Sequence, residues 1–95
     1  MKSNVDKFYK TNLEEILQEK GIKTVVITGY AANGAVLHTA TSAAFRGYNV
    51  IVPVGCMSAN YLYAEQYTAW HMLNSPGTRN KAFLTTVDLI SFLPL

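Results

Sequence analysis

The stretch TVVITGYAANGAVLHTA, residues 24–40, constrains the fold of this chain more than any other part of its sequence. It begins with a continuous apolar run of strand length, passes through a turn of small residues and continues into an alanine-rich segment that favours a helix. A strand, a tight turn and a helix in this order form the elbow at which α/β enzymes present a nucleophile or an anion-binding backbone. The turn contains no Ser, Cys, Asp or Glu, so its reactive side chain is missing.

Two further apolar runs have the length of strands, and segments of helical length separate all three. The pattern predicts helices over residues 12–21, 34–45 and 61–73, strands over 24–28, 50–54 and 82–86, a loop over 55–59 and a last helical turn over 87–93. Strands that are joined by helix-length crossovers pair in parallel. We therefore expect one α/β domain with a short parallel sheet, whose strands follow one another outward in sequence order.

Composition excludes several classes of protein. The hydrophobic content of 49% supports a packed core, whereas the charged fraction of 15% and the net charge of +2 provide no basic stripe for nucleic acid or an anionic membrane. The apolar runs are far shorter than the roughly 20 residues that span a bilayer. The single cysteine, Cys56, indicates a reducing compartment, and no Cys or His follows zinc-ligand spacing. We expect a cytoplasmic protein without metal or cofactor.

Several motifs together carry a family resemblance. The strand TVVITG, the turn YAANGAV, the following TA, the segment RGYNVIVP and the terminal TTVDLI resemble the second half of an isochorismatase-like cysteine hydrolase. That superfamily includes nicotinamidases and N-carbamoylsarcosine amidohydrolases. The resemblance implies a three-layer α/β/α, Rossmann-like fold, of which residues 1–95 form a single partial domain without the N-terminal strands.

The resemblance also implies a catalytic trio of Cys, Asp and Lys, in which the Cys attacks a carbonyl carbon, the Asp acts as base and the Lys supports the charged species. By motif, the Cys position falls on Ala35, whose methyl group cannot attack, and the Lys position falls on Lys2. The Asp would lie before Met1. The family has a cis peptide at the position of Tyr30 and Ala31, and it uses the backbone N–H groups of Ala31 and Ala35 as an oxyanion hole.

Two functions follow from this reading. The first is an isochorismatase-family hydrolase-like protein that is catalytically incomplete as this chain, with Tyr30 and His38 as substrate-binding side chains and an amide or vinyl ether as ligand. Isochorismatases proper also lack the Cys and cleave a vinyl ether with water, using the remaining acid. The alternative is a non-catalytic binding or assembly module derived from the same family.

Other reactive side chains have plainer explanations. Cys56 is either a relocated nucleophile or a small packing residue, and His38 is either an acid/base group or a polar contact on its helix. Together with His71, the aromatic residues Tyr63, Tyr67 and Trp70 line a pocket or form an interface, and we favour the interface. Glu65 and Asp88 are isolated carboxylates that suit a solvated face or a helix cap.

One edge of the first predicted strand is available to pair with another chain. A parallel strand as apolar as residues 25–27, from Val25 to Ile27, is normally paired on both edges. We therefore expect a homo-oligomer or a partner chain that pairs with this edge, or that uses the aromatic helix of residues 61–70.

Overall fold

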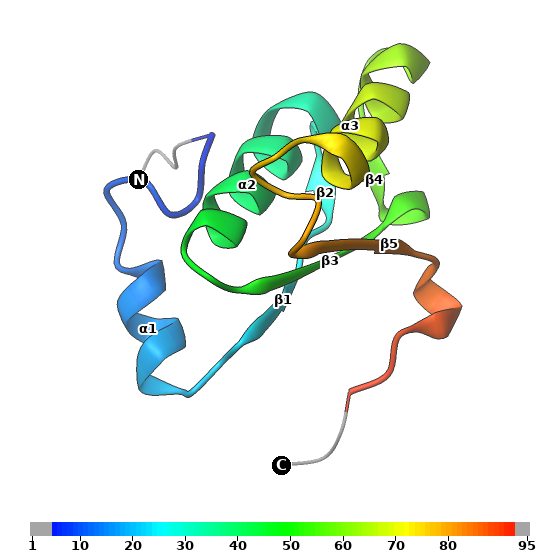
Figure 1. Ribbon diagram of the computed structural model, residues 1–95. Helices are drawn as coiled ribbons and strands as arrows, with labels where there is room; N and C mark the ends of the chain where they lie inside the picture. The colour runs from blue at the N-terminus through cyan, green and yellow to red at the C-terminus, as the bar shows by residue number, and fades with distance from the viewer. Residues whose placement is uncertain (1–4, 93–95) are drawn as a thin grey trace.

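The computed structural model describes residues 5–92, and its elements follow the predicted order (Figure 1). The helices are α1 (Leu13–Glu19), α2 (Leu37–Phe45) and α3 (Leu62–Asn74), and the strands are β1 (Thr24–Val26), β2 (Gly29–Tyr30), β3 (Asn49–Pro53), β4 (Met57–Ser58) and β5 (Ala82–Thr85). A π-helical turn over Ala32–Val36 precedes α2, and 3-10 turns cover Val54–Cys56 and Val87–Leu89. None of the described helices combines the length and apolar character needed to cross a bilayer.

The main sheet is parallel and has the strand order β1-β3-β5, as predicted. Val25 of β1 pairs with Val50 of β3, and Ile51 of β3 pairs with Phe83 of β5. Within the described residues, no strand pairs with the outer edge of β1.

A second, shorter ladder lies beyond the main sheet and joins β2 to β4, also in parallel. The prediction of a loop over residues 55–59 is therefore wrong at Met57 and Ser58, which pair with Gly29 and Tyr30. Two-residue strands carry too few side chains to show an alternating pattern, so periodicity does not reveal them.

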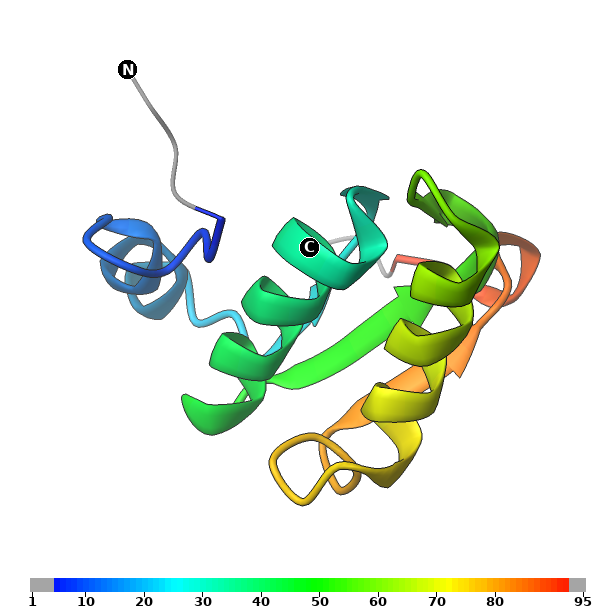
Figure 2. The same cartoon turned by 90° about the horizontal axis from the view of Figure 1, so that it is seen from above.

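Helices α2 and α3 lie over the same face of the sheet (Figure 2). Because successive side chains of a strand point to opposite faces, Val50 and Val52 are fully buried beneath these helices, whereas Ile51 points the other way. Phe83 of β5 is 55% exposed. The predicted α/β class with a short parallel sheet is confirmed, and the described residues supply two of the three expected layers, the sheet and the helices on one of its faces. We call the opposite side, with Ile51 and Phe83, the bare sheet face.

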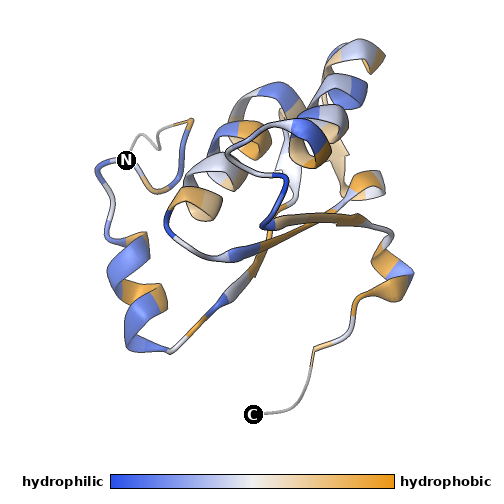
Figure 3. Cartoon of the chain, in the orientation of Figure 1, coloured by the Kyte–Doolittle hydropathy of each residue, from blue (hydrophilic) through white to orange (hydrophobic). Residues whose placement is uncertain are grey.

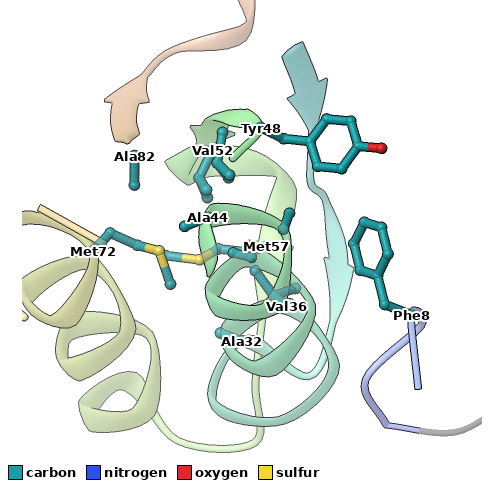
Figure 4. Close-up of a cluster of buried hydrophobic side chains, with 12 residues drawn as sticks. Phe8, Ala32, Val36, Ala44, Tyr48, Val52, Met57, Met72 and Ala82 are labelled. Atoms are coloured by element: carbon teal, nitrogen blue, oxygen red, sulfur yellow. The ribbon is translucent and has the colours of Figure 1, made fainter. Parts of the chain in front are cut away.

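The core lies between this sheet and the two helices (Figure 4). Met72 of α3 and Met57 extend toward each other, and Val36 and Val52 belong to the same buried cluster. Small residues on α2 let it approach the sheet closely, because their side chains occupy little space; Thr39, Ala40, Ser42, Ala43 and Ala44 are all buried. Strands β3 and β5 are strongly apolar through much of their length (Figure 3).

Aromatic and ionic contacts hold the N-terminal segment beside α2. The ring of Phe8 is buried and stacks on Tyr48, with 6.0 Å between the ring centroids. The guanidinium of Arg46 lies 4.9 Å from the centre of the Phe8 ring and 3.3 Å from a carboxylate oxygen of Glu14 in α1. These contacts place Lys7, the neighbour of Phe8, next to the elbow that follows β1.

Candidate functional site

The predicted elbow is built from β1, β2 and the start of α2. After β2 the Tyr30–Ala31 peptide bond is cis, as the family resemblance implied. The Ala31 carbonyl then accepts hydrogen bonds from the N–H groups of Gly34 at 3.0 Å and Val36 at 3.1 Å, and these bonds start the helical path at the π turn. Ala35 therefore lies in the first helical turn after the elbow.

A cavity of about 320 Å³ opens beside this turn. The residues that line it are Lys7, Leu13, Val26, Ile27, Thr28, Gly29, Tyr30, Ala35 and Thr39. The structure thus brings together two of the predicted positions, Tyr30 and Ala35, in one concave site. Ala35 is partly exposed to this space.

Among residues 5–92, those that line the cavity contribute an amine and hydroxyl groups, but no carboxylate, thiol or imidazole. The Thr39 hydroxyl is already engaged, because its Oγ1 accepts the Lys7 backbone N–H at 3.1 Å and donates to the Val5 carbonyl at 3.3 Å. Sequence reasoning missed Lys7, whose place depends on the burial of Phe8. The apolar Phe8 followed by Tyr9 was the only local signal that this segment returns to the fold.

Tyr30 lies at the mouth of the elbow cavity. Its side chain is 61% exposed, and its hydroxyl donates a hydrogen bond of 2.8 Å to Oδ1 of Asn60. Because Tyr30 belongs to β2 and Asn60 follows β4, this bond ties the ends of the short ladder together. The ring is thus held at the rim, where it can contact a bound molecule.

The structure places His38 away from the elbow cavity. His38 is exposed and lines a separate cavity of about 430 Å³ together with Asp6, Ser42 and Phe45. The other histidine, His71, lies 3.5 Å from the Thr41 hydroxyl through Nε2. The predicted Lys2 lies outside the described residues.

The remaining reactive side chains that the sequence singled out are Cys56, Glu65 and Asp88, and none of them is among the residues that line the elbow cavity. Cys56 ends the 3-10 turn after β3. A carboxylate oxygen of Glu65 accepts the Ala59 N–H at 3.2 Å, which holds the loop before α3. Asp88 is exposed, and a hydrogen bond from the Thr86 side chain holds the pKa of its carboxyl below the ordinary value. Across residues 5–92, no three His, Cys, Asp or Glu side chains gather as a metal site would require.

Comparisons with known proteins agree with this geometry. A family model described as the isochorismatase domain matches residues 1–88. An uncharacterized isochorismatase family protein of Bacillus subtilis is 40% identical over 53 residues, which are 56% of this chain and 29% of that protein.

Two solved structures of the same kind superpose well. A nicotinamidase from Staphylococcus aureus has 34% identity and a TM-score of 0.76, over 81% of this chain and 50% of that one. An N-carbamoylsarcosine amidase from Thermoplasma acidophilum has 32% identity and a TM-score of 0.77, over 96% of this chain and 49% of that one. The chain therefore spans about half the length of these solved relatives.

Proposed function

This chain belongs to the isochorismatase family, and we propose that it is a hydrolase-like member that is catalytically incomplete on its own. The observation that carries the proposal is the elbow cavity, whose lining includes Ala35, the residue to which the family resemblance assigns the nucleophile position. A methyl group forms no bond to a carbonyl carbon, and the described residues that line the cavity include no carboxylate that could act as base. The site can therefore hold a ligand but lacks the groups that would cleave it.

The proposed ligand is a small amide or vinyl ether. The cavity volume of about 320 Å³ falls at the lower end of the range of about 300–1,000 Å³ that small-molecule sites occupy. The names of the two solved relatives, a nicotinamidase and an N-carbamoylsarcosine amidase, support an amide. In this proposal the N–H groups of Ala31 and Ala35 hold the carbonyl oxygen of the ligand, and Tyr30 covers its exposed side.

The remaining predicted side chains have smaller parts in the proposal. Lys2 keeps the supporting role that the family resemblance assigns to it. His38 lines the neighbouring cavity, so we give it no contact with this ligand. The lone thiol of Cys56 fits a reducing environment, and we propose a cytoplasmic location on that ground.

A second candidate function is a hydrolase that a partner chain completes. The observation that favours it is the outer edge of β1, which has no paired strand among the described residues. Val26 of this strand and Ile27 after it also line the elbow cavity, so a strand added along residues 25–27 would lie directly beside the site. A carboxylate on that strand, from a second copy or another chain, would supply the missing base.

Replacing Ala35 with cysteine tests the proposal. In a Cys56→Ala background, we expect the thiol introduced by Ala35→Cys to react with iodoacetamide with a pKa about one unit or more below the ordinary value of about 8.5. The physical reason is the start of a helix next to Lys7, since both favour the thiolate. Nicotinamide or N-carbamoylsarcosine should slow this alkylation by occupying the cavity. The measurement is the alkylation rate as a function of pH.

The matched control is Asn80→Cys in the same background, because Asn80 is exposed in the loop before β5 and far in sequence from any helix start. Its thiol should titrate near the ordinary value and show no protection by either amide. The unmodified chain should turn over neither amide. Turnover that survives Cys56→Ala, or identical behaviour of the two introduced thiols, would contradict the proposal.

A further inference from the structure

A second concave surface lies where the strands of the main sheet begin. It is a cavity of about 450 Å³, and its lining includes Ile22, Lys23, Arg46, Tyr48, Asn49 and Lys81. Lys23 precedes β1, Asn49 opens β3 and Lys81 precedes β5, so the starts of all three strands contribute to it. We call it the strand-start cavity. The elbow cavity lies at the other end of β1.

The sheet brings two lysines of distant sequence to this cavity. The Lys23 carbonyl accepts the Asn49 N–H at 2.9 Å, and the Lys81 carbonyl accepts the Val50 N–H at 2.8 Å. Because neighbouring strands are about 4.8 Å apart, the two lysine backbones lie about 10 Å apart, on either side of β3. Their ammonium groups can therefore approach one ligand group from two sides.

The positive charge at the cavity is balanced only in part. Nε of Arg46 lies 3.3 Å from a carboxylate oxygen of Glu14, whereas no carboxylate of residues 5–92 pairs with Lys23 or Lys81. The described residues that line the cavity include no Asp or Glu. A ligand group with two negative charges would balance the two unpaired lysines.

The guanidinium of Arg46 is held in place by the fold itself. Besides its ion pair with Glu14, its Nη1 donates to the Ser42 carbonyl at 3.2 Å, and the group lies 4.9 Å from the centre of the Phe8 ring. Within the described part of the chain, Nη2 takes no part in these bonds. Its N–H groups can therefore donate to a ligand without first ordering the side chain.

Tyr48 offers a hydroxyl on a buried ring. The residue is only 6% exposed, yet its hydroxyl has no hydrogen-bond partner among residues 5–92. The hydroxyl is not enclosed in the core, since no fully buried side-chain oxygen of the described residues lacks a partner. Figure 4 shows it pointing away from the buried cluster. It is thus a fixed donor that a ligand in the strand-start cavity can use.

We propose that the strand-start cavity binds a small phosphate monoester. The ester carries a charge of about −1.5 to −2 at pH 7, which matches the unpaired Lys23 and Lys81. Arg46 Nη2 and the Tyr48 hydroxyl donate to its remaining oxygens, because arginine and neutral donors together suit phosphate. The cavity volume of about 450 Å³ lies within the range of about 300–1,000 Å³ of small-molecule sites and leaves room for the organic part beside Ile22.

Isothermal titration calorimetry of the full chain with phenyl phosphate at low ionic strength tests the proposal. We expect one saturable site per chain. Lys23→Gln and Lys81→Gln should each weaken the dissociation constant by about tenfold or more, which is the effect of losing a charge-assisted hydrogen bond. Tyr48→Phe keeps the ring beside Phe8 and should weaken it by about threefold, because it removes a neutral donor.

Lys10→Gln is the matched control, because it removes the same charge from a lysine outside the cavity lining. This variant should bind phenyl phosphate as the unmodified chain does, and circular dichroism checks that every variant is folded. Benzoate, which has the same ring and a single charge, should bind at least about tenfold more weakly. Absence of binding, equal losses in Lys10→Gln and Lys81→Gln, or equal affinity for benzoate would overturn the proposal.

Two further measurements identify the bound group and its place. Inorganic phosphate should bind more weakly than phenyl phosphate, and equal affinity would assign the cavity to the free ion instead of an ester. Phenyl phosphate should not slow the alkylation of the Ala35→Cys variant, because the strand-start cavity shares no residue with the elbow cavity. Slower alkylation would place the ester beside Lys7 and contradict the inference, which does not depend on the proposed function.

Discussion

Replacing Met72 with alanine is expected to destabilise the chain by about 2–5 kcal/mol, the usual cost of removing a fully buried large side chain. Met72 is 0% exposed and extends from α3 into the middle of the core, next to Met57 (Figure 4). A domain of ordinary stability unfolds with about 5–15 kcal/mol, so this single change removes a large part of the total. Urea denaturation followed by circular dichroism measures the effect.

Two further variants show whether the loss of stability comes from the space left in the core or from the chemistry of the side chain. Met72→Leu keeps most of the volume, and we expect it to cost less than about 1.5 kcal/mol. Leu89→Ala removes a similar side chain that is 76% exposed, and its effect should stay within about 0.5 kcal/mol. If Met72→Ala cost no more than Leu89→Ala, the core would not lie between α3 and the sheet.

Replacing Gly29 with alanine is expected to cost about 1–3 kcal/mol through the backbone alone. Gly29 has φ of +120°, which side chains with a Cβ rarely adopt, yet no atom lies within 4 Å of the place that a Cβ would occupy. The residue opens β2 and pairs with Met57, so the strain would act directly on the elbow. The same denaturation measurement gives the cost.

Gly55→Ala is the matched control for this backbone effect. A Cβ at Gly55 would also meet no atom within 4 Å, but its φ lies outside the positive region. We expect this variant to be nearly neutral or slightly stabilising, because alanine lowers the entropy of the unfolded chain. If Gly29→Ala and Gly55→Ala lost equal stability, the positive φ at Gly29 would not be the reason that glycine is needed there.

The sequence predicted the order of the helices and strands and the order of strands in the sheet. Both follow from apolar runs such as residues 50–54 and from the helix-length segments between them, which leave few ways to pair the strands. The elbow could be located because small residues cluster between a strand and a helix, whereas Ala35 within it was singled out by the family resemblance. These features are local in the sequence.

Features that depend on distant contacts were not predictable in the same way. The ladder between β2 and β4 consists of only two residue pairs, which have no periodic signal. Lys7 reaches the elbow cavity because Phe8 is buried against Tyr48, forty positions further along the chain. The spacing of α3 indicated that its aromatic residues share a face, but only the packing of Ala64 and Thr68 shows that this face points outward.

The bare sheet face also affects how the stability of this chain varies with temperature. The heat capacity of unfolding is governed by the apolar surface that is newly exposed, and Phe83 is largely exposed already in the folded chain. Unfolding therefore exposes less new apolar surface per residue, and gives a smaller heat-capacity change, than in a domain whose sheet is covered on both faces. A smaller heat-capacity change flattens the stability curve, so the chain loses little stability on cooling.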